Sequence, residues 1–344
     1  MLAITTLGLL VAAASESELD VLRLEVQNLR AALEHVQSEF GTDVEHGGRP
    51  GDVQWKLLVA AFVFLMQLGF AMIEAGSCRQ VNVISTYAKN ILDFTFGALT
   101  SVIFGCNIAY GIDALHFARD DPRQARFFNH LVYQATAATI VSGSIAERVS
   151  IPAYATISIF VFGILFSLAV RASWAGGFLA QLEVPLHDFA GAGVVHITGG
   201  ASALACAYVV GPRNGRWDSR KHGDFAPHDV KSVLSGVLIL WVAWYGFNPG
   251  ATVGMTTIQD ATQASHSAIT TTIAGATSGC FSILISYAHS ACIKPSKGIA
   301  RGAMEIDVLS LSNGILTGLV AVTAGSDVVD ITGALIIGVF AAVI

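Results

Sequence analysis

The feature that most constrains this chain is a series of nine long apolar runs separated by short polar loops. Each of the first eight runs holds roughly the 20 residues that an α-helix needs to cross the hydrocarbon core of a bilayer. We predict helical spans over 53–75, 90–112, 127–146, 151–171, 190–211, 230–250, 266–292, 307–325 and 331–344. Only 13% of the residues are charged, against about 25% in a typical soluble domain. The sequence therefore predicts an all-α polytopic membrane protein.

The distribution of Lys and Arg among the loops predicts an orientation. The loops after the fifth and seventh runs are rich in Lys and Arg, whereas the loops after the sixth and eighth runs contain neither. Basic loops stay in the cytoplasm, so the odd-numbered loops are expected inside. The loop after the second run is an exception, because it carries Arg119, Arg123 and Arg126 beside several aspartates. We predict a multi-pass plasma-membrane protein with an extracellular N-terminus.

The first 52 residues differ in character from the rest. Residues 1–14 are apolar, too short to span, and rich in alanine at their end, which is typical of a signal peptide. Residues 15–41 carry a seven-residue repeat that predicts a short coiled coil, with an amphipathic surface helix as the alternative. The a and d positions hold Leu19, Leu22, Val26, Leu29, Leu33, Val36 and Phe40. Residues 42–52 are predicted to be a linker.

Small and sulfur-containing residues suggest packing rather than chemistry. The five cysteines have no C-x-x-C spacing, so we expect free thiols. Glycines four residues apart, as in Gly275/Gly279 and Gly314/Gly318, favour close contact between helix backbones. The spans contain no nucleophile–base pair and no cluster of metal ligands, and the basic residues are explained by topology. The sequence therefore predicts neither an enzyme nor a cofactor or metal site, and it gives no support for nucleic-acid binding.

The fifth apolar run contains a histidine, a polar residue that is rare inside membrane helices. His196 lies eight residues after Asp188, roughly 12 Å along a helix and therefore close to the bilayer midplane. A neutral imidazole there can accept a proton through one nitrogen and donate through the other. The alternative is a histidine that bonds to a neighbouring helix. Asp188 is a preferred helix N-cap and also a negative charge that favours a nearby cation.

Aromatic and charged residues gather at the ends of the spans. Trp174, Trp244 and Phe247 lie near outer ends, where they fit either an interfacial belt or a site for ammonium-type cations. Charged residues at the inner ends are expected to snorkel or to pair. These are Glu74, Arg79, Lys89, Glu147 and Arg148.

Five stretches of the chain together resemble the Amt/Mep/Rh ammonium transporters. The first three are FLMQLGFAMIEAGSCR (64–79), ATAATIVSGSIAERV (135–149) and DFAGAGVVHITGGASALACAYVVGPRNGR (188–216). The others are LWVAWYGFNPG (240–250) and NGILTGLVAVTAG (313–325). The resemblance runs in order from about residue 53 to residue 344 and does not include residues 1–52.

The resemblance implies an inverted-repeat fold of eleven helices that assembles as a homotrimer, with one ammonium pore in each subunit. The chain as given would then end in about the ninth helix. The implied roles fall on six residues that match the family by position. Trp174 and Asp188 would recruit ammonium, Tyr133 and Phe247 would form the gate, Trp244 would line the pore, and His196 would relay the proton.

Three departures from the family pattern bear on activity. Tyr133 stands where a phenylalanine is usual, and Ala251 stands where some members have a serine. A second pore histidine belongs to a later D-x-x-x-x-F-x-x-H stretch that the given sequence does not reach. We expect transport of ammonium or ammonia, and the alternatives are an ammonium sensor that uses the same pocket or an inactive, truncated subunit.

Overall fold

A computed structural model of the chain describes residues 49–119, 121, 123–293 and 307–343. The chain divides into two units, Met1–Arg49 and Pro50–Ile344, and the description below concerns the second. The predicted signal peptide (1–14), the predicted coiled coil (15–41) and residues 42–48 of the predicted linker lie outside the described residues. The last three residues of that linker are already helical, because the first described helix begins at Pro50.

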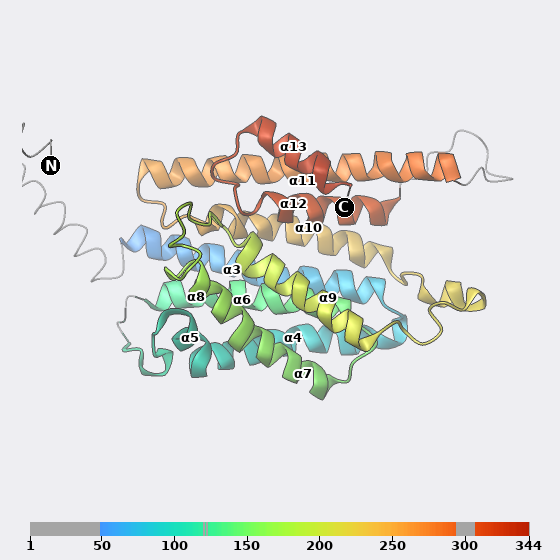
Figure 1. The fold of residues 1–344 in the computed structure, drawn as a ribbon, viewed down its shortest axis with the longest axis horizontal. Helices are drawn as coiled ribbons and strands as arrows, with labels where there is room; N and C mark the ends of the chain where they lie inside the picture. Colours follow the sequence, from blue (N-terminus) through green and yellow to red (C-terminus); the bar gives the residue numbers. More distant parts are fainter. Residues whose placement is uncertain (1–48, 120, 122, 294–306, 344) are drawn as a thin grey trace, which may run out of the picture. The chain divides into compact units, whose positions relative to one another are not determined.

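Within the described residues, the second unit consists of helices and their connections, without a strand (Figure 1). The helices are α3 (Pro50–Ser77), α4 (Val83–Thr100), α5 (Cys106–Tyr110), α6 (Gln124–Ser144), α7 (Ile151–Phe160), α8 (Ser167–Ala172), α9 (Thr198–Val210), α10 (Val230–Phe247), α11 (Ile258–Ile293), α12 (Val308–Val322) and α13 (Ile331–Ala341). Turns of π-helix connect α4 to α5 (Ser101–Gly105) and α7 to α8 (Val161–Phe166), and a third (Ala192–Ile197) leads into α9. The predicted all-α membrane fold is confirmed.

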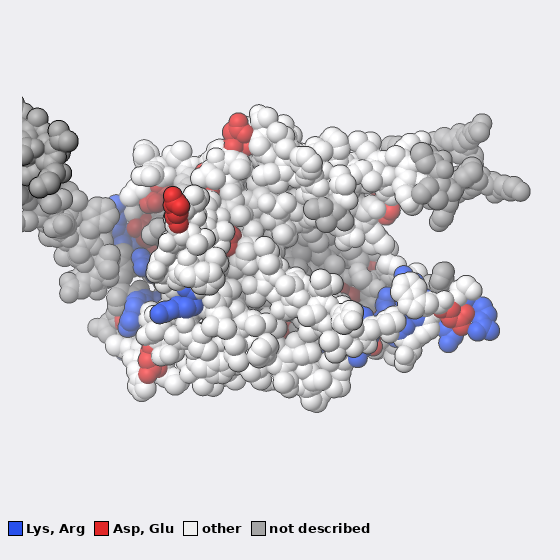
Figure 2. All heavy atoms as spheres, viewed as in Figure 1, with Lys and Arg blue, Asp and Glu red and all other residues white. Residues whose placement is uncertain are grey.

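Six helical segments of the described chain are long and apolar enough to cross a membrane. They are Pro50–Ser77, Gln80–Tyr110, Ile151–Ala172, Ala192–Val210, Gly223–Ala251 and Ile258–His289. Large apolar side chains on their flanks are exposed, as for Ile91 at 68% and Leu204 at 74%, which suits contact with lipid. Figure 2 shows the charged side chains toward the two ends of the bundle, with a largely uncharged band between them. The helices α12 and α13 are apolar but shorter than predicted.

Helix α6 was predicted to span but does not have the apolar composition of those six segments. Its polar side chains are buried and bonded to neighbouring helices instead of facing lipid. Thr139 donates to Gln67 Oε1 of α3 at 2.8 Å, and Gln134 donates to the Phe162 backbone oxygen at 2.6 Å. Protein therefore supplies the partners that hydrocarbon cannot, so α6 is an interior helix.

Glycines let neighbouring helices approach closely, as their spacing predicted. A Cβ atom at Gly318 of α12 would lie 2.4 Å from the Ala274 backbone oxygen of α11, and one at Gly314 would lie 2.6 Å from Ser282 Cβ. Neither position has room for a side chain, so the α11–α12 contact depends on small residues.

The bundle has two ends that are named here for later use. End A is where α3 begins and α10 ends, and end B is where α3 ends and α10 begins. Helix α6 runs from end A at Gln124 to end B at Ser144.

Candidate functional site

Two aromatic rings from separate helices stack at end A. Tyr133 of α6 and Phe247 of α10 have ring centroids 4.4 Å apart and planes inclined by 24°. The Tyr133 hydroxyl donates to the Phe247 backbone oxygen at 2.5 Å. Both side chains are buried, so the extra hydroxyl of Tyr133 is bonded within the stack.

Trp174 and Asp188 lie beside this stack on the connection between α8 and α9. The Trp174 ring meets Tyr133 edge-on at 6.1 Å, and its Nε1 donates to the Asp188 backbone oxygen at 2.6 Å. The Asp188 carboxylate accepts backbone N–H groups of Gly191 at 3.1 Å and of Gly193 and Val194 at 2.9 Å. The N-cap residue is Gly191 and not Asp188 as predicted, but the Asp188 carboxylate stabilises the start of this span by accepting these N–H groups.

His196 is placed by the π-helical turn that begins at Ala192. Its backbone N–H donates to the Gly191 oxygen, five residues back, at 3.2 Å. Gly191 itself has φ +99°, in the left-handed region that favours glycine. The His196 Nδ1 atom lies 3.3 Å from the same oxygen. Because a carbonyl oxygen only accepts, this contact assigns the proton of the neutral ring to Nδ1 and leaves Nε2 as an acceptor.

The His196 ring packs against two aromatic rings. The imidazole stacks on Trp244 of α10 at 5.4 Å with an interplanar angle of 19°, and it meets Phe247 edge-on at 5.3 Å. Nε2 is buried and has no hydrogen-bond partner among the described residues. The Trp244 Nε1 atom donates to Thr323 Oγ1 at 3.4 Å. A single imidazole nitrogen capable of accepting a proton is thus enclosed by apolar ring faces.

The structure brings the six predicted site residues together at end A. Five of them form a continuous series of ring contacts, and Asp188 joins them through the Trp174 hydrogen bond. Ala251 lies in the turn after α10 and packs against the same core. Sequence reasoning missed Thr323, the partner of Trp244, because a threonine at the end of an apolar helix carries no distinctive signal.

A second histidine beside the ring series was also missed. His130 lies one helical turn before Tyr133, and its Nδ1 is 3.2 Å from the Tyr110 hydroxyl. Its ring is 5.2 Å from that of Phe166. His130 follows Phe127, Phe128 and Asn129, so only its place inside a predicted span could have drawn attention to it.

A different cluster occupies end B, around the carboxylate of Glu147. The Arg79 Nε and backbone N atoms donate to Glu147 Oε1 at 2.8 and 3.1 Å, and Asn82 Nδ2 donates at 2.6 Å. The guanidinium of Arg213 donates to the second oxygen. The Glu147 side chain is fully buried. Burial raises the pKa of Glu147, but these hydrogen bonds outweigh it and hold the pKa at about 2.

The inner-end charges do not all behave as predicted. Glu147 pairs with Arg79 and Arg213, while Arg148 donates to the Gly211 backbone oxygen at 2.6 Å. Glu74 and Lys89 were expected to snorkel or pair at a helix end, but they are only 8% and 5% exposed. Their helices pack against α6 and place both side chains inside the bundle, away from water.

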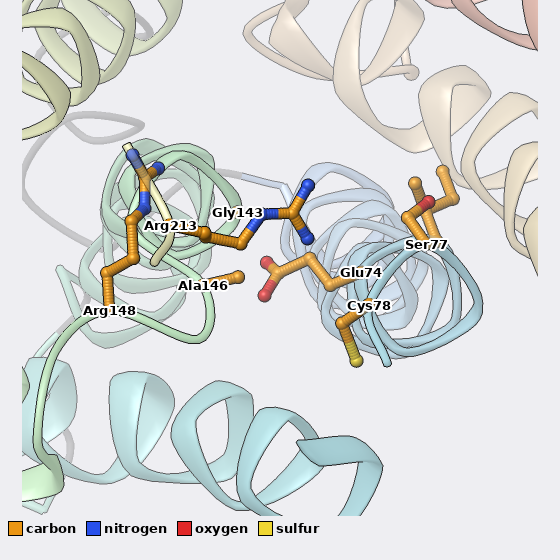
Figure 3. Close-up of a pocket in the computed structure, with 8 residues that line it drawn as sticks. Glu74, Ser77, Cys78, Gly143, Ala146, Arg148 and Arg213 are labelled. Carbon is orange, nitrogen blue, oxygen red and sulfur yellow. The ribbon is translucent and has the colours of Figure 1, made fainter. Parts of the chain in front are cut away.

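A pocket of about 320 Å³ lies at end B next to Glu74 (Figure 3). Its walls come from the end of α3, the end of α6 and the turns that follow α6 and α9. They are lined by Ile73, Glu74, Ser77, Cys78, Gly143, Ala146, Arg148 and Arg213.

The described residues contain no group of three or more His, Cys, Asp or Glu side chains placed to hold a metal ion. Cys78, Cys106, Cys206 and Cys280 are free thiols, as predicted.

The structure and the sequence agree on the kind of protein. An interior lined by stacked rings around one histidine, within a bundle of apolar helices, defines a membrane-spanning protein with a candidate conduction site.

The chain belongs to the ammonium transporter family. The sequence profile described as Ammonium Transporter Family matches residues 54–344. The chain is 32% identical over 316 residues to Ammonium transporter Amt2 of Haloferax mediterranei, covering 83% of this chain and 65% of that protein. It is 34% identical over 312 residues to Ammonium transporter Amt2 of Archaeoglobus fulgidus, covering 85% of this chain and 63% of that protein. The chain therefore spans just under two thirds of the length of these two relatives.

Solved structures show the same fold. A structure titled Sensor Amt Protein superposes with a TM-score of 0.74 at 29% identity, covering 85% of this chain and 72% of that one. The crystal structure of Saccharomyces cerevisiae Mep2 superposes with a TM-score of 0.70 at 21% identity, covering 88% of this chain and 68% of that one. The family relationship agrees with the absence of a predicted catalytic centre, since the curated relatives are named transporters and not enzymes.

Proposed function

We propose that the chain conducts ammonium or ammonia across a membrane through the ring series at end A. Trp174 and Asp188 recruit the cation, and the Tyr133–Phe247 stack forms the gate. Beyond the gate, Trp244 lines the path and His196 accepts or returns the proton. The proposal rests on the family membership of the chain and on this one arrangement of residues.

The observation that carries the proposal is the environment of His196 Nε2. A bare cation at the middle of a bilayer costs several kcal/mol or more, whereas neutral ammonia crosses an apolar lumen more easily. Loss of a proton from ammonium therefore has to precede passage along the apolar path beyond the gate. Nε2 is the acceptor that the geometry offers, because Nδ1 bonds to Gly191 and no described residue occupies Nε2.

Two residues recruit the ammonium cation in different ways: Trp174 through its ring and Asp188 through a fixed charge. The Trp174 ring is half-buried, and an aromatic face attracts an ammonium-type cation by cation–π interaction. Asp188 acts differently, because both of its carboxylate oxygens already accept backbone N–H groups. It contributes a fixed negative charge close to the Trp174 side chain and does not need to contact the cation.

His196→Ala tests the proposal through uptake of methylammonium into cells or proteoliposomes. We expect uptake to fall by roughly a hundredfold, the scale at which loss of a positioned proton acceptor acts. His116→Ala is the matched control, since His116 is an exposed histidine paired only with Asp113 among the described residues. An unchanged elution volume for both variants would show that assembly is intact.

Two results would contradict the proposal. Unchanged uptake by His196→Ala would make His196 a packing residue. Saturable methylammonium binding by the wild-type protein without uptake would favour the sensor instead.

We further propose that end A faces outward in the plasma membrane and that the subunit assembles as a homotrimer. The orientation rests on the basic loop after α9, which lies at end B, and on the Lys and Arg residues that follow α11 in the sequence. A cysteine at Val184, which is 81% exposed at end A, should react with an impermeant thiol reagent on intact cells, and one at Trp217 of end B should not. The reverse pattern would invert the orientation. The mass of the detergent-solubilised protein checks the trimer.

A further inference from the structure

The end-B pocket shares helices with the ring series. Ile73 of α3 lines the pocket and also packs against the core cluster that includes Tyr133 and Trp244. Gly143, another lining residue, lies ten residues after Tyr133 on α6, roughly 15 Å along the helix. The pocket therefore lies at the end-B end of α6, the helix that carries Tyr133 of the ring series.

Glu74 is the acidic group of this pocket, and one of its oxygens is unpartnered. The side chain is 8% exposed, and Figure 3 shows its carboxylate pointing into the pocket. Oε2 accepts from Ser142 Oγ at 2.8 Å, whereas Oε1 is buried without a hydrogen-bond partner. The Asn90 amide also acts on Glu74, and one of its two N–H groups donates to the Thr86 backbone oxygen at 3.1 Å. A buried carboxylate oxygen in this state favours a bound cation or a proton.

Two other charged groups are buried next to Glu74 and have partners other than its carboxylate. Lys89 and Asp93 carry opposite charges and both act on Glu74. Asp93 accepts hydrogen bonds from Tyr154 and Ser158, and the Lys89 ammonium lies 5.2 Å from the centre of the Tyr154 ring. Neither Lys89 nor Asp93 bonds to Glu74 Oε1, so this oxygen remains open to a further partner.

The arginines that line the pocket have other partners. Arg213 pairs with Glu147 and lies over the Phe225 ring at 4.9 Å, and Arg148 bonds to the Gly211 oxygen. Their positive charges oppose tight binding of a cation beside Glu74. A site on a conduction path needs that property, because an ion that binds too strongly does not leave.

We propose that Glu74 and the surrounding pocket form a second ammonium site, at end B, where the conducted species is held as a cation before release. This inference rests on the proposed function and extends it from end A to the far end of the path. The ligand is a small monovalent cation of the size of ammonium, bound through Glu74 Oε1. A divalent metal does not fit, because the described residues supply no third acidic, histidine or cysteine ligand here.

Crystals of the protein soaked in rubidium chloride provide a direct test, since rubidium is a monovalent ion of similar size with an anomalous signal. We expect an anomalous peak next to Glu74 Oε1 in the wild type. Glu74→Gln removes the charge and keeps an oxygen for Ser142, and it should abolish the peak. Gly143→Ala should weaken the peak, because the added Cβ would lie 3.8 Å from Glu74 Oε1 in ordinary contact.

Matched controls separate the site from general effects of these substitutions. Glu183→Gln removes an exposed carboxylate from the connection between α8 and α9, and Gly200→Ala adds a methyl group to α9 with nothing within 4 Å. Both should retain the peak. In parallel, the apparent affinity for methylammonium in uptake should fall roughly ten- to hundredfold in Glu74→Gln, the range expected for losing a hydrogen bond to a charged group.

Two outcomes would overturn this inference without touching the proposed function. One is normal methylammonium uptake with no rubidium peak in the wild type, which would mean that Glu74 holds a proton. The other is an equal peak in Glu74→Gln, which would place the ion on other groups. Failure of the proposed function looks different, because wild-type uptake is then absent whether or not rubidium binds at Glu74.

Discussion

The aromatic site at end A and the Glu147 cluster at end B are held together by different kinds of interaction. At end A, ring faces lie 4.4 to 6.1 Å apart and the contacts are those of neutral groups. At end B, one buried carboxylate holds two guanidinium groups and an amide, and three arginines lie within 4.9 to 5.7 Å of the Phe225 ring. The packing of ring shapes therefore determines the arrangement of side chains at end A, and charge pairing determines it at end B.

This difference follows from where the two clusters lie. The ring series is built from the interior of spans, where an uncompensated charge is expensive. The Glu147 cluster joins three loops, namely the turn after α3, the turn after α6 and the connection after α9. Loops have no regular backbone pairing to hold them together, so a shared carboxylate supplies the connection.

The largest expected effect comes from removing the charge at end B while keeping its shape. Glu147→Gln should destabilise the protein by about 2–3 kcal/mol, because it leaves two guanidinium groups without their anion. This is less than for a fully buried pair, since Arg79 is partly exposed. The measurement is the thermal unfolding midpoint in detergent. Asp218→Asn, at an exposed pair with Arg220, is the control and should change the midpoint little.

Acid titration of the same variants sharpens this result. The pKa of Glu147 is lowered from 4.5 to about 2 on folding, so its stabilisation is complete above pH 4.5 and is lost as the pH falls toward 2. The wild type should lose stability over this range more steeply than Glu147→Gln. Parallel acid profiles for the two proteins would show that Glu147 is not the charged anchor of end B.

The smallest effect is expected at end A, where the shape of the side chain matters more than its polar group. Tyr133→Phe keeps the ring that stacks on Phe247 and removes one buried hydrogen bond, at a cost of about 1 kcal/mol. Methylammonium uptake should change by less than about tenfold, because the stack remains. Tyr133→Leu is the matched variant that removes the ring. If Tyr133→Phe lost as much uptake as Tyr133→Leu, the hydroxyl would be essential and the contrast between the two ends would fail.

The apolar runs and the motifs predicted most of end A. The length of the runs predicted most helix bounds to within a few residues, but α4 begins seven residues and α11 eight residues before the predicted start. The family resemblance implied which side chains meet. The same reasoning predicted α6 as a helix but not its interior position, because hydropathy cannot distinguish a helix that faces lipid from one whose Thr139 and Gln134 bond to its neighbours.

End B was less predictable because its contacts join residues far apart in the sequence. Glu147 pairs with Arg79, 68 residues earlier, and with Arg213, 66 residues later. Arg148, the next residue in the sequence, bonds to the Gly211 backbone oxygen. The burial of Glu74 depends on how α3 packs against α6, and no local pattern encodes that packing.

The backbone of Glu147 has a consequence for engineering. Its φ of +65° places it in the left-handed region, which costs a residue with a Cβ roughly 1–2 kcal/mol. A score based on backbone preference alone would flag the position and recommend glycine. That replacement would relax the turn but detach the loops that the carboxylate joins. A residue that is unfavourable by local criteria thus marks a position where long-range contacts decide the amino acid.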